Sequence, residues 1–523
     1  MAHILVTEEL APTGLAALTK AGHEVDVQLG LDPPALLGAI VGAHALIIRS
    51  ATQVTSAVLE AGTDLVVVGR AGIGLDNVDV GAATQRGVMV VNAPQSNILS
   101  AAEHTMALLL SQARNVPQAH ASLVAGKWER TRWEGVELHG KTLGVIGLGR
   151  IGALVAQRAL GFGMRLVAYD PYVSADRARQ LGIELLSLDD LVSQADFITL
   201  HVNKSKETIG LVGRELLAKA KPGLRVINVS RGGIVDEEAL AEAIRAGTIG
   251  GAALDVFAAE PTTSSPLFEL DSVVVTPHLG ASTREAQDKA GVTIAEQVVL
   301  ALAGEFVPFA VNVDAGEASE TVRPFLTLVE QMGRIFSSLG AGLPETLDVE
   351  YQGALADYDT RILTLSLLKG LLSAATHDPV SFVNAPQLAA ERGLTWRETK
   401  SPTSADYVNL VTVRGGRHAV AGTIAGVRSQ PRIVMVDDHA VDLPPSRHLL
   451  IVRNDDRPGM IGVVGTMLGA AGLNILNMAI GQSPHGDTAL MALSTDAEVP
   501  DNMIAELRET PGILDVAAVS QPI

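Results

Sequence analysis

Three charged residues with side chains suited to acid–base chemistry follow separate apolar runs in the middle of the chain. Arg231 lies in NVSRGGIVDE, Glu260 lies in DVFAAEP, and His278 follows the run Val273–Val275. Histidine readily exchanges a proton near neutral pH. A carboxylate on its far ring nitrogen would fix the tautomer and stabilise the imidazolium, whereas an arginine would clamp the carboxylate of a small acid with two donors. We therefore predict His278 as the acid/base, Glu260 as its partner and Arg231 as the carboxylate-binding residue.

Each of these residues also has a structural interpretation. His278 could cap a helix or lie in the core, Glu260 with Pro261 could form a plain turn, and Arg231 could lie on the surface. Their shared position after expected strands favours chemistry, because the carboxyl ends of strands in a doubly wound sheet converge on one crevice.

A glycine-rich turn between an expected strand and an expected helix predicts a dinucleotide site. GLGRIG follows the apolar run Leu143–Ile146, and its glycines would let the pyrophosphate approach the helix N-terminus. Asp170 ends the next expected strand, about 20 residues further on, where a carboxylate binds ribose hydroxyls and repels a 2′-phosphate. This pattern predicts NAD rather than NADP. The expected cofactor-binding residues are Gly147, Gly149, Arg150, Ile151, Gly152, Asp170 and Asp255.

The elements that must position these residues form two alternating α/β series. Residues 1–95 alternate buried strands, such as Ile4–Val6, with Ala-rich helical segments, which predicts an α/β layer sandwich. A long helix is expected from Asn97, and the second series begins at Lys141. Another long helix, from Thr283, would return the chain to the first domain and leave a cleft between two lobes.

The last two fifths of the chain have a different character. Residues 311–447 contain an expected helical pair near 321–338 and 361–375, followed by β-like runs. From His448 the order of elements is βαββαβ, which predicts a ferredoxin-like sandwich.

Composition limits the classes of function. The 523 residues carry a formal charge of −19 and no cysteine. The negative charge argues against nucleic-acid binding, and the missing cysteines exclude disulfides, thiol nucleophiles and Cys-ligated zinc; we expect no metal site. The N-terminus MAHILVTEEL lacks the pattern of a signal peptide, and no apolar run approaches the roughly 20 residues of a membrane span. We therefore expect a cytoplasmic protein that contacts no membrane.

Several segments resemble a known enzyme family. GLGRIG, NVSRGGIVDE, ALDVFAAEP and TPHLGAST are similar to the signature segments of the D-isomer-specific 2-hydroxyacid dehydrogenases. RSATQVT, VVGRAGIGLDNVD, NILSAAEHT and KWER, with the tail, resemble the long-form branch that oxidises 3-phosphoglycerate with NAD to start L-serine biosynthesis. The resemblance implies the roles argued above for Arg231, Glu260 and His278.

The same resemblance implies four domains. They are a flavodoxin-like substrate domain of residues 1–96 and 283–310, a Rossmann NAD domain of 97–282, an α+β intervening domain of 311–447, and a ferredoxin-like ACT domain of 448–523. It also implies a phosphate pocket on the first domain and an arginine near KWER that reaches the partner subunit's site. Arg130 and Arg132 are both candidates for that arginine. The expected substrate-binding residues are Arg49, Ser50, Arg70, Asn97 and Arg132.

The segment NDDRPGMIGVV followed by GLNI resembles the amino-acid-sensing motif of ACT domains. It implies Asn454, Asp456 and Asn474 as effector-binding residues, L-serine as the effector, and a homo-oligomer, which we expect to be a tetramer. For residues 311–447 the resemblance implies an allosteric site for phosphorylated substrate, with an inert spacer as the alternative. The basic residues in its second half include Arg414, Arg417, His418, Arg428, Arg432 and Arg447.

Three other functions fit parts of the pattern. The chain could oxidise an unphosphorylated D-2-hydroxy acid such as glycerate or lactate, in which case Arg49 and Arg70 would have no phosphate to bind. It could be an NADH-sensing corepressor of the same fold, although the ordered ACT-like tail argues against that. It could also be an amino-acid-binding regulator with an inactive dehydrogenase half, although the complete Arg-Glu-His set argues against this interpretation.

Overall fold

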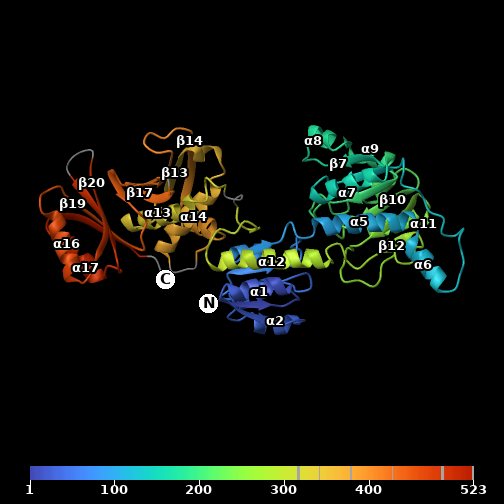
Figure 1. Ribbon diagram of the computed structural model, residues 1–523, viewed down its shortest axis with the longest axis horizontal. Helices are drawn as coiled ribbons and strands as arrows, with labels where there is room; N and C mark the ends of the chain where they lie inside the picture. Colours follow the sequence, from blue (N-terminus) through green and yellow to red (C-terminus); the bar gives the residue numbers. More distant parts are fainter. Residues whose placement is uncertain (315–318, 341, 377–379, 427, 484–487, 521–523) are drawn as a thin grey trace.

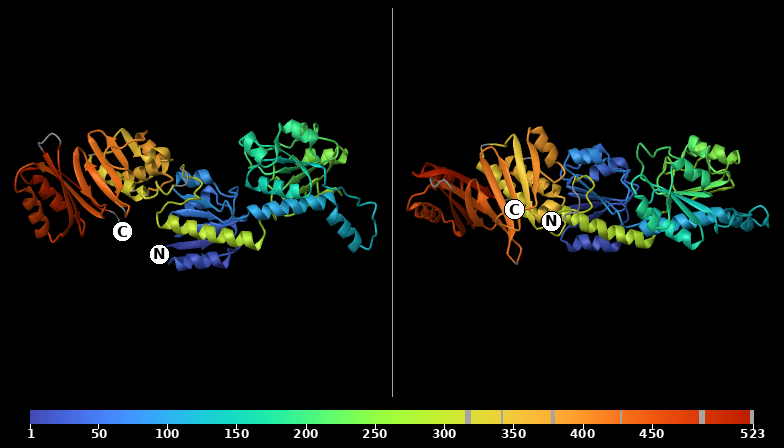
Figure 2. Two further views of the ribbon diagram at one scale, coloured as in Figure 1. Left: turned by 45° about the horizontal axis from the view of Figure 1, so that its top comes forward. Right: turned by 90° about the horizontal axis from the view of Figure 1, so that it is seen from above.

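The structure is a computed structural model of the chain, and it describes residues 1–314, 319–340, 342–376, 380–426, 428–483 and 488–520. Four sheets follow one another along the chain. Figures 1 and 2 show an elongated molecule, with the C-terminal four-stranded sheet at one end and the seven-stranded sheet at the other. Within the described residues, no helix is both long enough and apolar enough to cross a membrane.

The first lobe is a five-stranded parallel sheet with helices on both faces. Its strand order, β2-β1-β3-β4-β5, is the flavodoxin-like order that the sequence predicts. The edge strand β2 was not expected, because its sequence EVDV is half polar and only partly buried. The strands are β1 (His3–Val6), β2 (Glu24–Val27), β3 (Ala45–Ile48), β4 (Val67–Arg70) and β5 (Met89–Asn92), and the helices are α1 (Pro12–Lys20), α2 (Pro33–Ala39), α3 (Ser56–Ala61) and α4 (Val80–Gln85).

The second lobe is a seven-stranded parallel sheet of the Rossmann type. Its order is β12-β11-β10-β9-β6-β7-β8, so the chain changes direction between β6 and β9, where such folds form their binding crevice. The strands are β6 (Thr142–Ile146), β7 (Arg165–Tyr169), β8 (Glu184–Leu185), β9 (Phe197–Leu200), β10 (Leu224–Asn228), β11 (Ile249–Leu254) and β12 (Val273–Val275). The helices are α7 (Arg150–Gly161), α8 (Ala175–Gln180), α9 (Leu188–Gln194), α10 (Arg214–Leu217) and α11 (Glu237–Arg245).

Two long helices connect the lobes. α5 (Ile98–Ala113) leaves the first lobe and packs on α7 and β11, whereas α12 (Arg284–Leu302) returns to pack on α1 and β4. The hydroxyls of Ser100 on α5 and Thr283 before α12 lie 2.7 Å apart, so the two crossings are adjacent. The short helix α6 (Val116–Val124) has no buried residue and projects from the second lobe (Figure 1).

A six-stranded mixed sheet with three helices follows. Its order is β14-β13-β15-β16-β17-β18, and α13 and α14 match the expected helical pair. The edge strand β14, TWRETKS, is polar and mostly exposed, and the sequence did not predict it. The strands are β13 (Thr346–Gly353), β14 (Thr395–Ser401), β15 (Asn409–Gly415), β16 (His418–Ala425), β17 (Gln430–Val436) and β18 (His439–Leu443), and the helices are α13 (Phe325–Leu339), α14 (Arg361–Ala375) and α15 (Ala385–Glu391).

The last sheet has the expected βαββαβ order. Its four strands are arranged β20-β21-β19-β22. One face, with Leu450 and Val452, packs on its own two helices. The other face, with Leu449 and Ile451, shares a core with α13, so the central strand β19 is covered on both faces. The elements are β19 (His448–Asp455), α16 (Met460–Ala470), β20 (Ile475–Gln482), β21 (Thr488–Thr495), α17 (Asp501–Glu509) and β22 (Ile513–Ser520).

Candidate active site

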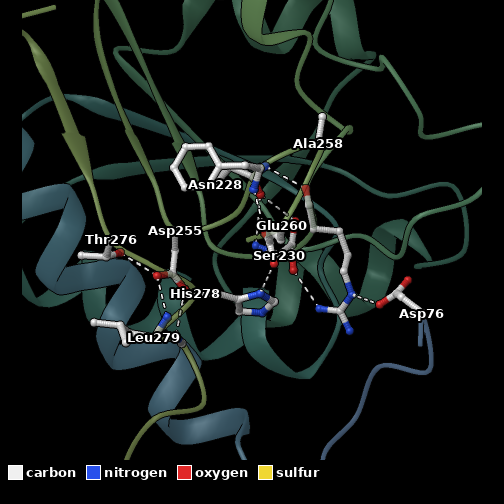
Figure 3. A network of polar contacts seen from close by, with 12 residues as sticks. Asp76, Asn228, Ser230, Asp255, Ala258, Glu260, Thr276, His278 and Leu279 are labelled. Atoms are coloured by element: carbon white, nitrogen blue, oxygen red, sulfur yellow. Dashed lines mark hydrogen bonds and ion pairs between the residues drawn. The ribbon is translucent and has the colours of Figure 1, made fainter. Parts of the chain in front are cut away.

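The three residues predicted for acid–base chemistry follow three neighbouring strands. Arg231 follows β10, Glu260 follows β11 and His278 follows β12, and these strands are adjacent and parallel in the sheet. Their carboxyl ends therefore meet at one edge. Nδ1 of His278 lies 2.6 Å from Oε2 of Glu260. Figure 3 shows the two side chains beside each other. The structure thus forms the histidine–carboxylate pair that the sequence predicts.

His278 is held in an unusual backbone conformation. Its φ angle of 54° lies in the left-handed region, which non-glycine residues rarely adopt. Its backbone N–H donates to the carbonyl of Asp255 over 2.8 Å. The side chain is 44% exposed, and within the described part of the chain no group hydrogen-bonds Nε2. The ring nitrogen opposite Glu260 is therefore open to a substrate.

Opposite pKa shifts mark His278 and Glu260 as a coupled pair. The hydrogen bond that His278 donates to Glu260 raises the pKa of His278 against the effect of burial. The charges of Glu260 and Asp255 raise this pKa further, whereas Arg231 lowers it. Burial alone would raise the pKa of Glu260, but the hydrogen bonds from His278 and from the Phe257 N–H lower it on balance. The pair therefore favours an imidazolium beside a carboxylate.

Arg231 reaches from the second lobe to the first. Its Nε lies 3.2 Å from Oδ2 of Asp76, and its Nη1 donates to the carbonyl of Ser230 over 2.7 Å. Asn228 shapes this turn, because its Nδ2 donates to the carbonyl of Arg231 and its Oδ1 accepts from Ser230. A Cβ at Gly74 would lie 2.3 Å from Nη2 of Arg231, so a larger residue there would displace the guanidinium from this position.

Two more arginines of the first lobe lie near Arg231. Arg70 ends β4, and its Nε donates to the carbonyl of Arg49 over 3.2 Å. Burial, followed by the charges of Arg231 and Arg49, lowers the pKa of Arg70 to about 10, although Asp76 and Glu8 act in the opposite direction. Three guanidinium groups thus share one region of the cleft, which favours a bound anion.

A residue that sequence reasoning missed shapes the loop after β3. The carboxylate of Glu8 accepts backbone N–H groups from Arg49, Ser50, Ala51 and Thr52 at 2.8, 3.2, 3.1 and 3.0 Å. Burial raises the pKa of Glu8, but these hydrogen bonds lower it on balance. Glu8 therefore fixes the loop that carries two expected phosphate-binding residues. No local pattern in the sequence marks this role, because the residues that Glu8 contacts lie 41 to 44 positions further along the chain.

The other expected substrate residues differ in their surroundings. Asn97 precedes α5 without capping it, and its Oδ1 is buried with no partner among the described residues. With Arg49 and Gly72 it lines a small cavity of about 40 Å³. The N–H of Ser50 is bound to Glu8, whereas its side chain is exposed.

The two candidate arginines near KWER differ in the contacts of their side chains. Nη2 of Arg132 lies 2.7 Å from Oδ2 of Asp271, and its guanidinium stacks over the ring of Trp133 at 4.7 Å. Arg132 is therefore tied to its own subunit. Arg130 is exposed and has no such partner in the described part of the chain.

The glycine-rich turn is built for close approach of a cofactor. A Cβ at Gly147, whose φ is 93°, would lie 2.5 Å from the carbonyl oxygen of His201, and a Cβ at Gly152 would lie 2.1 Å from that of Gly147. Gly149 faces open space before α7. Asp170 accepts the N–H groups of Leu148 and Tyr172, each at 2.8 Å. These residues fit a dinucleotide. Of the other expected cofactor residues, Arg150 is exposed and Ile151 is half-buried at the start of α7.

Asp255 has contacts that the sequence did not predict. Its side chain is fully buried, and its carboxylate accepts from Thr276 Oγ1 and from the N–H groups of Leu279 and Gly280 at 2.6, 2.7 and 2.8 Å. Nε2 of His104 lies 3.2 Å from it. Asp255 thus holds the turn that carries the acid/base residue, and its expected contact with the cofactor stays a prediction.

The expected effector residues do not come together within one chain. Asn454 is buried and Asp456 accepts from Gln482 over 2.8 Å, at the end of the ACT sheet where β19 and β20 finish. Asn474 lies at the opposite end, where its N–H donates to Asp496 over 2.9 Å. A site that uses all three residues would need two copies of the chain.

The basic residues of the intervening part are also divided. Arg428 and Arg432 line a cavity of about 510 Å³ with Tyr407, whereas Arg414 lines a separate cavity of about 820 Å³. His418 is paired with Asp437 at 3.0 Å.

Three family models match successive parts of the chain. Residues 106–280 match the D-isomer specific 2-hydroxyacid dehydrogenase NAD binding domain, residues 321–437 match the D-3-phosphoglycerate dehydrogenase intervening domain, and residues 448–512 match the ACT domain. The chain is 52% identical over 507 residues to a D-3-phosphoglycerate dehydrogenase of Mycobacterium tuberculosis, covering 96% of each chain. It is 42% identical over 525 residues to that of Methanocaldococcus jannaschii, covering 99% of this chain and 100% of the relative.

Solved structures resemble the two lobes. The TT0316 protein of Thermus thermophilus is 36% identical, with a TM-score of 0.55, and the match covers 59% of this chain and 99% of that one. D-Lactate dehydrogenase from Aquifex aeolicus, complexed with NAD and lactic acid, is 26% identical with a TM-score of 0.53, over 58% of this chain and 96% of that one.

Proposed function

The chain belongs to the D-3-phosphoglycerate dehydrogenases, and we infer from its site that it oxidises 3-phospho-D-glycerate to 3-phosphohydroxypyruvate with NAD, the first step of L-serine biosynthesis. The observation that carries this function is the His278–Glu260 pair on strand ends beside Arg231, in one cleft with Arg49 and Arg70. NAD, when bound at the glycine-rich turn, supplies the acceptor for the hydride that leaves C2 of the substrate.

The acid–base chemistry follows from the hydrogen bonds of His278. Nε2 takes the proton of the C2 hydroxyl during oxidation and returns it during reduction. Glu260 holds the other ring nitrogen and stabilises the imidazolium that forms. Arg231 binds the α-carboxylate and thereby fixes C2 beside the imidazole.

The arginines of the first lobe distinguish a phosphorylated substrate from a plain one. We assign the phosphate to Arg49 and Arg70, assisted by Ser50 and Asn97. An arginine that is buried enough to have a lowered pKa is costly without an anion. A D-2-hydroxy acid without phosphate would leave Arg70 with only Asp76 and Glu8 as counter-charges, so that alternative is the weaker one.

The deciding experiment measures NADH consumption with 3-phosphohydroxypyruvate, hydroxypyruvate and pyruvate. We expect a strong preference for the phosphorylated keto acid. Arg70→Gln should raise KM for that substrate by roughly 10²-fold and leave the plain acids nearly unchanged. Arg86→Gln is the matched control, since Arg86 is exposed at the end of α4. Equal rates with all three acids would favour the alternative substrate class.

We further propose a homo-oligomer, with L-serine as the effector bound between ACT domains. Two apolar surfaces support the assembly. On the ACT edge, Leu476, Met478 and Ile480 of β20 are 56%, 44% and 43% exposed. On the second lobe, α6 and the segment after it expose Leu123 and Trp128. Pairing through both surfaces in one molecule would give a tetramer.

Two smaller expectations complete the proposal. The cavity lined by Arg428 and Arg432 could bind a phosphorylated acid through Arg428, since Arg432 lies 3.6 Å from Asp442 of the same cavity. Such binding would make the intervening part an allosteric site. A cytoplasmic location remains a prediction from the sequence.

A further inference from the structure

The turn that carries His278 is clamped by a single buried carboxylate. Asp255 accepts hydrogen bonds from Thr276 Oγ1 and Leu279 N–H (Figure 3). It also accepts the Gly280 N–H, and its own carbonyl accepts the N–H of His278. A left-handed φ at a residue other than glycine is locally unfavourable, so surrounding contacts must hold it. The orientation of the acid/base residue therefore depends on where the Asp255 carboxylate lies.

One side chain from another element fixes that carboxylate. His104 lies on α5, and its Nε2 is 3.2 Å from Oδ1 of Asp255 and 3.1 Å from Oγ1 of Thr276. Because the Thr276 hydroxyl donates its own proton to Asp255, both oxygens are acceptors for a proton on Nε2 of His104. His104 is 19% exposed and Asp255 is fully buried, so water competes little for these contacts.

The buried, charged carboxylate of Asp255 needs the hydrogen bond from His104. Burial alone would raise the pKa of Asp255, but the hydrogen bonds from His104 and Thr276 lower it on balance, so the group is an ionised carboxylate inside the protein. A buried charge that loses a donor is costly and moves toward other donors. The nearest ones are the N–H groups of the His278 turn.

We propose that His104 is a positioning residue for the reaction: its Nε2–H fixes Asp255 and Thr276, and through them the orientation of His278 toward the substrate. The contacts recorded for His104 in the described chain are with Asp255 and Thr276 and not with Arg231 or Glu260. Its removal should therefore change turnover more than binding. The inference rests on the acid/base role proposed above for His278.

The test uses the full-length enzyme with His104→Ala and His104→Gln. Loss of the donor should lower kcat roughly 10- to 100-fold, because misplacement of a catalytic group by about 1 Å has effects of this size. KM for 3-phosphohydroxypyruvate and Kd for NADH should stay within about threefold of wild type. Glutamine presents an amide N–H near the place of Nε2, so His104→Gln should recover most of kcat.

A matched control and a second variant sharpen the test. Glu103→Gln changes the preceding residue of α5, whose side chain is 62% exposed and lies 3.6 Å from Arg158 on α7, and it should leave kcat unchanged. Thr276→Val removes the second donor to Asp255 and should lower kcat in the same way. Combined with His104→Ala, it should lower kcat by less than the product of the two single effects, since both act on one carboxylate.

Three results would overturn the inference: a kcat for His104→Ala within about twofold of wild type, a His104→Gln variant as slow as His104→Ala, or an unchanged kcat in Thr276→Val. The Thr276→Val result remains decisive if His104→Ala does not fold. A wild-type enzyme that does not turn over 3-phosphohydroxypyruvate would instead overturn the proposed function. An active wild type with unaffected variants would overturn only the role of His104.

Discussion

The hydrogen bond between His278 and Glu260 makes the stability of the site depend on pH. The folded-state pKa of His278 is raised, so its contribution to stability is complete below its ordinary pKa of 6.5 and is lost as pH rises through the folded value. The pKa of Glu260 is lowered, so its contribution is complete above 4.5 and is lost as pH falls through the folded value. Both contributions are therefore complete between pH 4.5 and 6.5.

Glu260→Gln should shift the pH profile of oxidation to lower pH. Oxidation needs a neutral imidazole, so kcat/KM rises with pH through the pKa of His278, and removal of the carboxylate that raises this pKa moves the rise downward. Reduction needs the imidazolium and should lose activity at neutral pH. We also expect kcat to fall roughly 10²- to 10⁴-fold, because the ring loses its orienting partner. Profiles measured in both directions check this, and an unmoved profile would remove Glu260 from the proton chemistry.

Asp170→Asn should narrow the preference for NADH over NADPH. The substitution removes the charge that repels a 2′-phosphate. It keeps an oxygen acceptor for only one of the Leu148 and Tyr172 N–H groups, because these bond different oxygens of Asp170. We expect kcat/KM for NADH to fall roughly tenfold and that for NADPH to fall less. The measurement is initial rates with both cofactors. An unchanged ratio would mean that Asp170 does not contact the ribose.

The role of a single residue can be predicted from the sequence when a local pattern marks it, but not when it arises only from a contact with a distant residue. Arg231, Glu260 and His278 were predictable, because each follows an apolar strand in one sheet and those ends must converge. Glu8 and His104 were not, because their roles arise from contacts with residues 41 and 151 positions away, and no local pattern marks them. The clamp on the His278 turn is thus a property of the fold and not of the motif.

At the scale of elements, the loop after β3 depends on one carboxylate from the end of β1. Glu8→Gln keeps the shape of the side chain but removes its charge and replaces one of its two acceptor oxygens by a donor NH2 group. Four backbone N–H groups donate to the Glu8 carboxylate, so some of them would lose their acceptor. We expect KM for 3-phosphohydroxypyruvate to rise roughly tenfold, because Arg49 and Ser50 lose their fixed positions. KM for hydroxypyruvate should not change.

Steady-state kinetics with both keto acids check this prediction. Glu60→Gln is the control, since Glu60 is exposed on α3 of the same lobe. If both KM values rise together in Glu8→Gln, the loop serves the whole site and not the phosphate alone.

The sequence predicted the buried elements better than the edge strands. β3 and β5 are buried throughout and consist of nearly continuous apolar runs, so their sequences identify them. β2 and β14 are edge strands with polar, exposed residues, and hydrogen bonds to one neighbour define them rather than any apolar pattern. The helix from Thr283 was predictable, because Thr283 caps α12 by accepting the N–H of Ala286.

At the scale of the whole molecule, a substitution that separates the ACT domains of two chains should abolish effector binding as well as assembly. The residues expected to bind L-serine lie at opposite ends of the ACT sheet, so one site needs two chains. Met478→Glu places a charge on an exposed side chain of β20. We expect it to reduce a tetramer to dimers and to abolish inhibition by serine. The turnover measured without serine should remain. Light scattering and NADH assays with L-serine check this. Leu514→Glu on the opposite edge strand, β22, is the control. Full serine inhibition in Met478→Glu would place the effector elsewhere.

The last prediction concerns a site completed by a second subunit. Arg132 is occupied by Asp271 and Trp133 of its own chain, so between the two candidates the contacts favour Arg130 as the residue that reaches the partner's cleft. Arg130→Ala and His278→Ala should each be nearly inactive as homo-oligomers. In a mixed dimer, the chain with an intact His278 receives Arg130 from its partner, so one of the two sites is complete.

Co-expression of the two variants should therefore recover about a quarter of the wild-type activity, because random pairing makes half of the dimers mixed and each mixed dimer has one complete site. The same experiment with Arg132→Ala in place of Arg130→Ala should show no such recovery, since Arg132→Ala alone should remain active. If mixing Arg130→Ala with His278→Ala restores nothing although mixed dimers form, Arg130 acts within its own chain. Each subunit would then carry its whole site without help from a neighbour, and the exposed surface of α6 would serve assembly alone.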